Sequence, residues 1–509
     1  MAGLGSFARL TGAAWTLVRA DALAPREIDE VLPPGARSLA RFLRLFAGPT
    51  ARRGRPGERL ARALESLGPV AIKLGQFLST RADIFGASFA EDLSHLKDRL
   101  PPFPTEIARA ETERALGRPL DGLLSRFEAP VAAASLAQAH KVVLLDGREA
   151  AVKVLRPGIE QRVAADVEAM TLAASLVEAW IPAARRLEPK AFAAIVIRAL
   201  QLELDLRFEA AGADELRQVM ANDAYMRAPA VVWEGVARRV LTLEWAQGLP
   251  LSEAAALEQP GLERTRLADN LIRAFLAQAL DHGVFHADLH EGNLFIAPPA
   301  LITAVDFGII GRLGPGERRY LAEILWGFLQ RDYERVAAVH FEAGYVPWRH
   351  DRSAFAQALR AVGEPVFGRK AADVSMGRLL AQLFEITALF DMRLRPELVL
   401  LQKTMVTVEG VARRIDPEHD IWAAAEPVVR RWIARELSPV VKAREFAREA
   451  RAALTALARL AQAESAPPPV PVAEAPQESL SGFTGFLLGA AIPVLIFIMA
   501  WILMHGARG

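Results

Sequence analysis

The sequence predicts an α+β fold with two lobes, a small lobe built on a sheet and a larger helical lobe after it. Residues 140–145 and 149–155 are rich in β-branched and aliphatic side chains, and an Asp-Gly dipeptide between them signals a hairpin. Residues 238–245 (RRVLTLEW) are a third strand candidate. From about residue 262 to 460 the pattern is mostly helical.

The first 60 residues are predicted to form short helices separated by prolines. They contain ten Arg and five acidic residues, an excess of 10 − 5 = +5. A helical face turned toward an anionic membrane explains this excess, and so does a solvated helix surface; both interpretations stay open. Residues 59–78 have helical spacing with a Gly68-Pro69 break, and the helix must stop at the PPFP of residues 101–104.

Residues 191–222 are predicted to be helical and carry Glu203, Asp205 and Glu209. At about 100° per residue, Asp205 and Glu209 stack one turn apart, whereas Glu203 points about 120° away from Glu209. One helix can therefore serve two cations in different directions. A solvated acidic face is the alternative.

The most informative segment is residues 283–308, GVFHADLHEGNLFIAPPALITAVDFG. Asn293 follows Asp288 by five residues, and a predicted strand at 301–305 leads to the D-F-G that begins with Asp306. Phosphoryl transfer from ATP needs a carboxylate beside the attacking oxygen and two oxygen ligands for Mg²⁺. Asp288 suits the first role, and Asn293 and Asp306 suit the second. This spacing, with a small sheet before a helical body, is typical of protein-kinase-like folds.

Lys153 lies on the second strand of the hairpin, in AAVKVL, and is predicted to hold the α- and β-phosphates. A lysine that extends along the sheet edge is the alternative. The segment before the hairpin has no G-x-G-x-x-G and no G-x-x-x-x-G-K-[ST], which excludes Rossmann and P-loop sites. It has an alanine-rich loop instead, whose methyl groups restrict the φ > 0 conformations that glycine permits, so the nucleotide should be held differently.

Together these segments resemble the UbiB family of atypical kinases, the kinase-like proteins of ubiquinone biosynthesis. The resemblance runs from roughly residue 60 to 420. It rests on AIKLGQFLSTRAD (71–83), which looks like the family's KxGQ signature, LKDRLPPFP (96–104), the alanine-rich loop, AVK (151–153), Glu203/Asp205 with Glu209, HADLHEGN, DFG and EGVARRIDP (409–417).

The resemblance implies a KxGQ segment that covers the active site where a protein substrate would otherwise dock. Lys73 is then expected to pair with Glu203 and Asp205, and Lys153 with Glu209 and the nucleotide. The implied cofactors are ATP and Mg²⁺. The expected catalytic residues are Asp288, Lys153, Glu209, Lys73, Gln76, Glu203 and Asp205; the nucleotide contacts are Ala132, Ala133, Ala134, Ser135, Lys153, Glu244, Trp245 and Ala246; the metal ligands are Asn293 and Asp306.

The chain departs from the family pattern at several positions. Leu289 and Glu291 stand where the family usually has prolines, which should loosen that loop without removing a ligand. Lys97 replaces a common Gln, and Gly212 occupies a position often held by Asn. Relatives often have two membrane spans, whereas one segment here is long enough, so the membrane topology stays open.

That segment, residues 485–504, has twenty residues without a charge, enough to cross a bilayer once. A buried core helix is the alternative. Gly485 and Gly489 form a small-xxx-small pair through which two such helices can dimerise. The flanking charges, acidic residues before the span and Arg508 after it, weakly place the C-terminal tail in the cytoplasm. Two observations favour a cytoplasmic catalytic body instead: ATP is cytoplasmic, and the N-terminus makes a poor signal peptide. We therefore expect a protein of the bacterial inner (cell) membrane whose catalytic body faces the cytoplasm.

The predicted organisation has six parts. They are an N-terminal helical region (1–60), a KxGQ extension (61–130), a kinase-like N-lobe with inserted helices (131–250), a helical C-lobe (251–460), a flexible linker (461–482) and a transmembrane anchor (483–504).

The composition of the chain excludes several classes of function. The net charge of +1 gives no argument for nucleic-acid binding, and the absence of cysteine excludes disulfides, Cys-ligated metals and thiol catalysis. The leading hypothesis is a membrane-anchored atypical kinase or ATPase that supports ubiquinone synthesis, with a membrane lipid or quinone precursor and the biosynthetic enzymes as partners. The alternatives are a small-molecule kinase and a nucleotide-binding scaffold with low turnover.

Overall fold

The computed structural model describes residues 4–23, 25–26, 34–48, 53–79, 87–94, 96, 100–180, 188–221, 223, 225–366, 386, 389–392 and 396–436. The predicted linker (461–482) and anchor (483–504) lie outside these residues, as does Lys97. Within the described ranges, no helix combines the length and the apolar character that a membrane crossing needs. The described chain forms two compact units, the first from Met1–Gly212 and Ala230–Trp245, the second from Ala213–Pro229 and the described residues within Ala246–Leu480.

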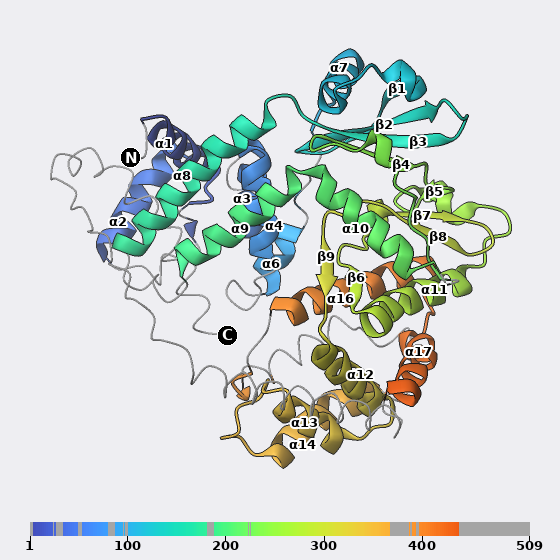
Figure 1. Ribbon diagram of the computed structural model, residues 1–509. Helices are drawn as coiled ribbons and strands as arrows, with labels where there is room; N and C mark the ends of the chain where they lie inside the picture. The colour runs from blue at the N-terminus through green and yellow to red at the C-terminus, as the bar shows by residue number, and fades with distance from the viewer. Residues whose placement is uncertain are drawn as a thin grey trace, which may run out of the picture. The chain divides into compact units, whose positions relative to one another are not determined.

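The first unit contains an antiparallel four-stranded sheet with the order β1-β2-β3-β4 (Figure 1). Strands β2, β3 and β4 agree with the three predicted strands, and β1 was not predicted. Because β1 extends to Ala133, the prediction that Ala132 and Ala133 belong to a loop is wrong. The strands are β1 (Leu124–Ala133), β2 (Ala137–Leu144), β3 (Glu149–Leu155) and β4 (Val240–Glu244).

One face of this sheet is covered by the helix α7 (Thr105–Leu116) and the short 3₁₀ turn η3 (Leu120–Gly122) (Figure 1). Alternate residues of a strand point to the same face, so the strands supply a continuous apolar layer. The buried residues of this layer, from the strands and from the segment at η3, are all aliphatic. They are Leu120, Leu123, Leu124, Val142, Leu144, Ala150, Val152, Val154 and Val240.

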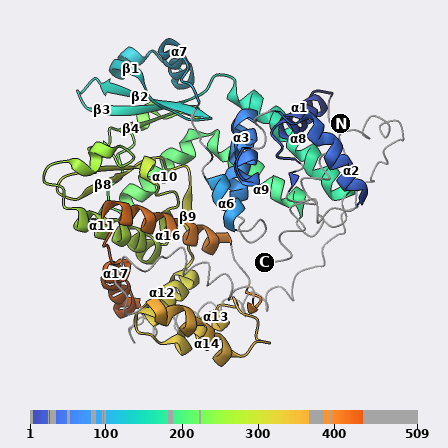
Figure 2. The same cartoon turned by 180° about the vertical axis from the view of Figure 1, so that it is seen from behind.

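The helical part of the first unit packs around two apolar clusters. Helix α1 lies along α8 and also contacts α3, while α3, α4 and α6 pack on one another (Figures 1 and 2). The predicted break falls at Gly68, whose φ of 104° suits glycine, and it separates α3 from α4. The helices are α1 (Leu4–Arg19), α2 (Pro34–Leu43), η2 (Arg44–Phe46), α3 (Pro56–Leu67), α4 (Pro69–Ser79), α6 (Ala87–Ser94) and α8 (Ile159–Trp180).

The region 191–222 is not one helix. Helix α9 (Pro189–Glu203) ends at Glu203, and α10 (Leu206–Val219) begins three residues later. The angular separation that a single helix assigns to Glu203 and Glu209 is therefore wrong. Each acidic side chain takes its direction from its own helix, and Asp205 lies between the two helices.

The second unit is mainly helical and contains two small sheets, β5-β7-β8 and β6-β9. Its strands are β5 (Leu249–Pro250), β6 (Val284–His286), β7 (Leu294–Ala297), β8 (Leu301–Ala304) and β9 (Ile310–Arg312). Its α-helices are α11 (Arg264–Ala277), α12 (Pro315–Leu329), α13 (Tyr333–Glu342), α14 (Arg352–Gly363), α16 (Pro396–Ile415) and α17 (Ile421–Glu436). The shorter turns in both units are η5 (Trp233–Gly235), η6 (Ala254–Glu258), η7 (Gln278–His282, π-helical), η8 (Glu291–Asn293) and η9 (Glu364–Val366).

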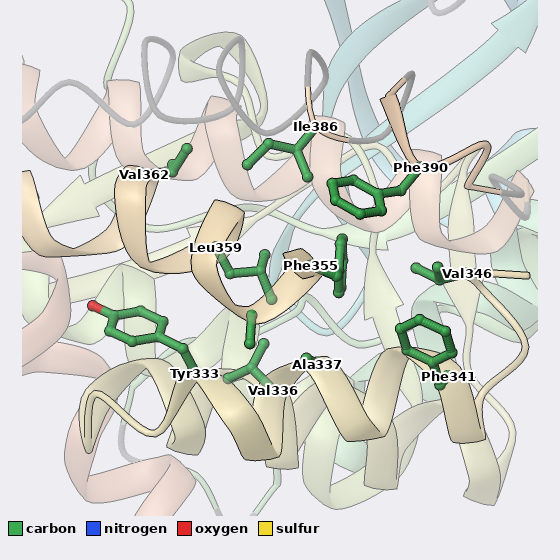
Figure 3. Close-up of a cluster of buried hydrophobic side chains, with 11 residues drawn as sticks. Tyr333, Val336, Ala337, Phe341, Val346, Phe355, Leu359, Val362, Ile386 and Phe390 are labelled. Carbon is green, nitrogen blue, oxygen red and sulfur yellow. The ribbon is translucent and has the colours of Figure 1, made fainter. Parts of the chain in front are cut away.

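An aromatic core joins α13 to α14 in the second unit (Figure 3). Phe355 of α14 packs edge-on against Phe341 and Phe390, with ring centroids 6.1 and 5.0 Å away. His340 is buried in the same neighbourhood and stacks edge-on with Phe355 at 5.3 Å. The cluster consists of Tyr333, Val336, Ala337, Phe341, Val346, Phe355, Ala356, Leu359, Val362, Ile386 and Phe390.

His340 makes the stability of this core depend on pH. Burial lowers the pKa of His340 from 6.5 to about 4. As the pH falls, the unfolded chain takes up the proton first, so this group's contribution is complete above pH 6.5 and is lost between pH 6.5 and 4. The loss amounts to about 3 kcal/mol. We expect His340→Phe to reduce the fall in unfolding free energy between pH 7.5 and 4.5 by about 2.5 kcal/mol, measured by denaturant titration. Identical pH slopes in the two proteins would contradict the prediction.

Candidate active site

A buried histidine organises the loop that carries Asp288. His286 ends β6, and its Nδ1 accepts a hydrogen bond from the backbone N–H of Asp288 at 3.1 Å. Its Nε2 must then carry the proton, which it donates to the carbonyl oxygen of Val305 at 3.2 Å. Complete burial lowers the pKa of His286 and keeps the ring neutral. A neutral ring makes both bonds at once and so ties the Asp288 loop to the end of β8.

Two further hydrogen bonds bring the three predicted oxygen-bearing residues together within the second unit. The Asn293 side-chain Nδ2 donates to the Asp288 carbonyl oxygen at 3.0 Å. The Val305 N–H donates to the Asn293 carbonyl oxygen at 2.9 Å, which places Asn293 beside the residue that precedes Asp306. Because Nδ2 faces Asp288, the Asn293 Oδ1 is the amide atom left to bind a ligand.

The backbone at Asp306 turns so that its side chain is exposed while the next side chain, that of Phe307, is buried. The Asp306 φ is 62°, in the left-handed region that non-glycine residues rarely adopt. Asp306 is exposed, whereas Phe307 is buried and its ring lies 5.4 Å from that of His286. Strain of this kind persists where the surrounding structure fixes it. Here the buried Phe307 anchors the turn that presents the Asp306 carboxylate.

The donor set is suitable for Mg²⁺. Magnesium prefers oxygen ligands and is usually held by one or two carboxylates together with phosphates and water. Asn293 and Asp306 provide one amide and one carboxylate oxygen donor. In the part of the chain that the structure describes, no group of three or more His, Cys, Asp or Glu side chains is arranged as a metal site.

The Asp288 loop is fastened to α16 at two points that the sequence did not indicate. The Thr404 Oγ1 donates to the Ala287 carbonyl oxygen at 3.0 Å. Arg414 forms an ion pair with Glu291, one of the residues that stand in place of the family's prolines. The other, Leu289, is completely buried. Packing and an ion pair thus hold the loop that the missing prolines were expected to loosen.

In the first unit, Lys153 is held by Glu209. The Lys153 Nζ lies 2.8 and 2.9 Å from the two carboxylate oxygens of Glu209, which is buried near the start of α10. Lys153 lies opposite Ala139 of β2 and Leu241 of β4, so it is on an interior strand of the sheet. A lysine that merely extends along a sheet edge does not fit this position.

The KxGQ segment lies on α4, and its lysine pairs with the end of α9. The Lys73 Nζ is 3.0 Å from the Glu203 Oε2. A Cβ on Gly75 would lie 2.3 Å from the Leu96 Cδ1, so glycine allows this close packing. Gln76, one residue further along α4, is half-buried.

Asp205, which the resemblance also pairs with Lys73, is bound by a neighbouring arginine on α10. It accepts two hydrogen bonds from the Arg207 guanidinium, at 2.8 and 2.6 Å. These bonds lower the pKa of Asp205. Arg207 is therefore an Asp205 partner that the sequence reasoning missed.

The alanine-rich segment ends β1 at Ala133 and then forms a tight turn that leads into β2 at Ala137. The Ala134 N–H donates to the Ala137 carbonyl oxygen at 2.8 Å, and Ser135 is fully buried. The Arg156 Nε donates to the Ala134 carbonyl oxygen at 2.9 Å, and its Nη1 donates to the Pro101 carbonyl oxygen at 3.0 Å. Arg156 thus joins the turn to the segment before α7, a role that the sequence did not reveal.

The remaining predicted nucleotide contacts lie at the end of β4. Glu244 is the last residue of the strand and pairs with Arg148 at 2.9 Å. The Trp245 N–H donates to the Glu149 carbonyl oxygen at 3.0 Å, and the Lys141 ammonium lies 5.0 Å from the centroid of the Trp245 ring. Ala246 is buried and is the first residue of the second unit's main segment.

Comparisons with known proteins place the chain among kinase-like proteins. Residues 95–340 match the ABC1 atypical kinase-like domain, and residues 359–420 match the UbiB helical domain. A relative from Marinobacter nauticus named probable protein kinase UbiB is 41% identical over 389 residues, which cover 75% of this chain and 71% of that relative. A Pseudomonas paraeruginosa relative with the same name is 38% identical over 427 residues, covering 81% of this chain and 80% of the relative.

The chain belongs to the UbiB family of atypical kinases. A solved structure supports the fold: Rv3197 from Mycobacterium tuberculosis, in a complex with erythromycin, has a TM-score of 0.52 and 24% identity. The similarity covers 72% of this chain and 93% of that chain. Within this UbiB-family protein, Lys153, Glu209, Asp288, Asn293 and Asp306 all fall in the kinase-like match.

Arg414 falls in the UbiB helical domain, so the Glu291–Arg414 pair links the two family regions. We expect Arg414→Glu to speed amide exchange in residues 288–293, because like charges would then face each other across the loop. The combined exchange Glu291→Arg/Arg414→Glu should restore protection. A half-exposed pair contributes about 0.5–1 kcal/mol, which corresponds to a several-fold change in exchange rate. Hydrogen exchange with mass spectrometry measures it, and equal rates in the single and double variants would rule out the tie.

Proposed function

We propose that this protein is a membrane-anchored, Mg²⁺-dependent ATPase or atypical kinase that supports ubiquinone biosynthesis. The observation that carries the proposal is the hydrogen-bonded convergence of Asp288, Asn293 and Asp306 in the second unit. Family membership and the Lys153–Glu209 pair support it. The names of the relatives point to a kinase of the UbiB type, and the quinone pathway comes from the family resemblance.

Each residue has a role that follows from its chemistry. The Asp288 carboxylate would orient the attacking hydroxyl or water and take its proton. The Asn293 Oδ1 and the Asp306 carboxylate would hold Mg²⁺, which when bound neutralises the charge that develops on the phosphates. Glu209 would keep the Lys153 ammonium charged and oriented toward the α- and β-phosphates. The backbone N–H groups of the alanine-rich turn would approach the nucleotide, together with residues 244–246.

The KxGQ helix bears on the choice of substrate. The Lys73–Glu203 pair ties α4 to the end of α9 by an ion pair whose two side chains are mostly buried. We propose that this helix covers the substrate cleft, so that the acceptor is a quinone precursor or another lipid rather than a protein. The anchor at residues 483–504 would keep the body at the cytoplasmic face of the bacterial inner membrane, near the ubiquinone enzymes. Dimerisation through that helix is part of the same proposal.

The metal requirement can be tested directly. We expect ATP hydrolysis by the full chain to need Mg²⁺ and to fall by roughly 100-fold or more in Asp306→Asn, because the variant loses a charged ligand. Asp121→Asn is the matched control, since the Asp121 side chain is 83% exposed on η3. Release of phosphate gives the rate. Turnover that is unchanged in Asp306→Asn would contradict the assignment.

A second experiment separates an enzyme from a scaffold. A strain that lacks this gene should recover its ubiquinone content with the wild-type chain and fail to recover it with Asp288→Ala, since the variant cannot orient the nucleophile. Quinone content is measured by chromatography, and immunoblotting checks that both proteins accumulate equally. Rescue by Asp288→Ala would favour the nucleotide-binding scaffold.

A further inference from the structure

The N-terminal helices expose a group of large apolar side chains. Trp15 of α1, Phe42 of α2, and Leu45 and Phe46 of η2 are 50%, 56%, 77% and 43% exposed. Phe46 connects the group, because its ring lies 5.7 Å from that of Trp15 and 5.4 Å from that of Phe42. We call these four residues the aromatic surface. Exposed apolar residues are normally scattered, so a contiguous group indicates a contact with something other than the described residues.

The same helices have a separate inner face. Leu17 and Val18 of α1 are buried with Ala63 of α3, and Leu43 of α2 packs against that cluster. The contacts that stabilise the helix bundle therefore come from other positions than the aromatic surface. The four exposed side chains do not belong to this buried cluster.

The three elements that carry the aromatic surface have charged side chains of one sign. Helix α1, helix α2 and η2 contain five arginines and no acidic residue. Arg9 is engaged by Asp166, and Arg44 donates to the Pro25 carbonyl oxygen. Arg19 and Arg41 are exposed: Arg19 is one helical turn after Trp15, and Arg41 is one helical turn before Leu45. Both arginines thus flank the apolar group, with their charge available at its rim.

We propose that the aromatic surface inserts into the interface of an anionic phospholipid bilayer. Trp and Phe side chains favour the boundary between headgroups and acyl chains, and arginines at the rim reach phosphate groups. A second copy of the chain is a poorer occupant, because a symmetric contact would bring the same arginines together without acidic partners on these elements. The proposal needs neither ATP hydrolysis nor the segment at 485–504. Under this proposal the first unit contacts the membrane directly, with the side that carries the aromatic surface facing the lipid.

The absence of cysteine makes a site-specific test straightforward. Leu45→Cys in the full-length protein accepts an environment-sensitive fluorophore at the most exposed position of the surface. Asp121→Cys, on η3, is the labelled control. Each protein is mixed with vesicles of phosphatidylcholine, or of phosphatidylcholine with phosphatidylglycerol, and the vesicle-bound fraction is isolated by flotation before its emission is recorded.

We expect the label at position 45 to shift to shorter wavelength and to resist iodide quenching on vesicles that contain phosphatidylglycerol, while the label at position 121 does neither. Adding Arg19→Gln/Arg41→Gln to Leu45→Cys should abolish the shift. Arg266→Gln/Arg430→Gln, the same change of charge at two exposed arginines of the second unit, should leave it intact.

Two results would overturn the proposal. One is a label at position 45 that stays open to iodide on floated vesicles containing phosphatidylglycerol, or a failure of the protein to float at all. The other is a shift that grows with protein concentration in the absence of lipid, which would assign the surface to a second copy. Neither depends on nucleotide turnover, so the outcome is independent of the proposed enzymatic activity.

Discussion

The candidate site depends on His286 being buried and neutral. A charged imidazolium would lose its acceptor, and with it the bond from the Asp288 N–H. Burial prevents this by lowering the pKa of His286. The ring then connects the Asp288 loop to Val305, the residue before Asp306. The Asn293–Val305 hydrogen bond brings Asn293 to the same place. The position of all three oxygen-bearing side chains thus rests on one desolvated ring.

In the first unit, two lysines are each placed beside a carboxylate. In one continuous helix, the helical geometry would fix the angle between the Glu203 and Glu209 side chains. The break between α9 and α10 removes that constraint, so Glu203 meets Lys73 and Glu209 meets Lys153. Each ion pair is largely buried, and a buried lysine needs its carboxylate because an unpaired charge there is costly. The pairs therefore fix the KxGQ helix and the β3 lysine independently.

The arginines of the N-terminal region show why local composition left two interpretations open. Some of these arginines form ion pairs within the first unit: Arg9 pairs with Asp166, and the buried Arg59 pairs with Asp21. Others, such as Arg19 and Arg41, stay at the surface beside exposed aromatic rings. A count of charges cannot separate the two groups, because the difference lies in what packs against each side chain. The proposed lipid contact rests on that difference.

The sequence by itself determined the family, the strand that carries Lys153 with its two neighbouring strands, the break at Gly68, and the spacing from Asp288 to Asp306. These features are local, since a hairpin, a helix break and a loop motif are each encoded within a few adjacent residues. It did not reveal β1, the division between α9 and α10, the pairing of Asp205 with Arg207, or the ties from Thr404 and Arg414 to the Asp288 loop. Thr404 and Arg414 lie more than a hundred residues from their partners, and only the packing of α16 brings them there. Tertiary structure decided these because burial and long-range contact, not local propensity, select which partner a polar side chain finds.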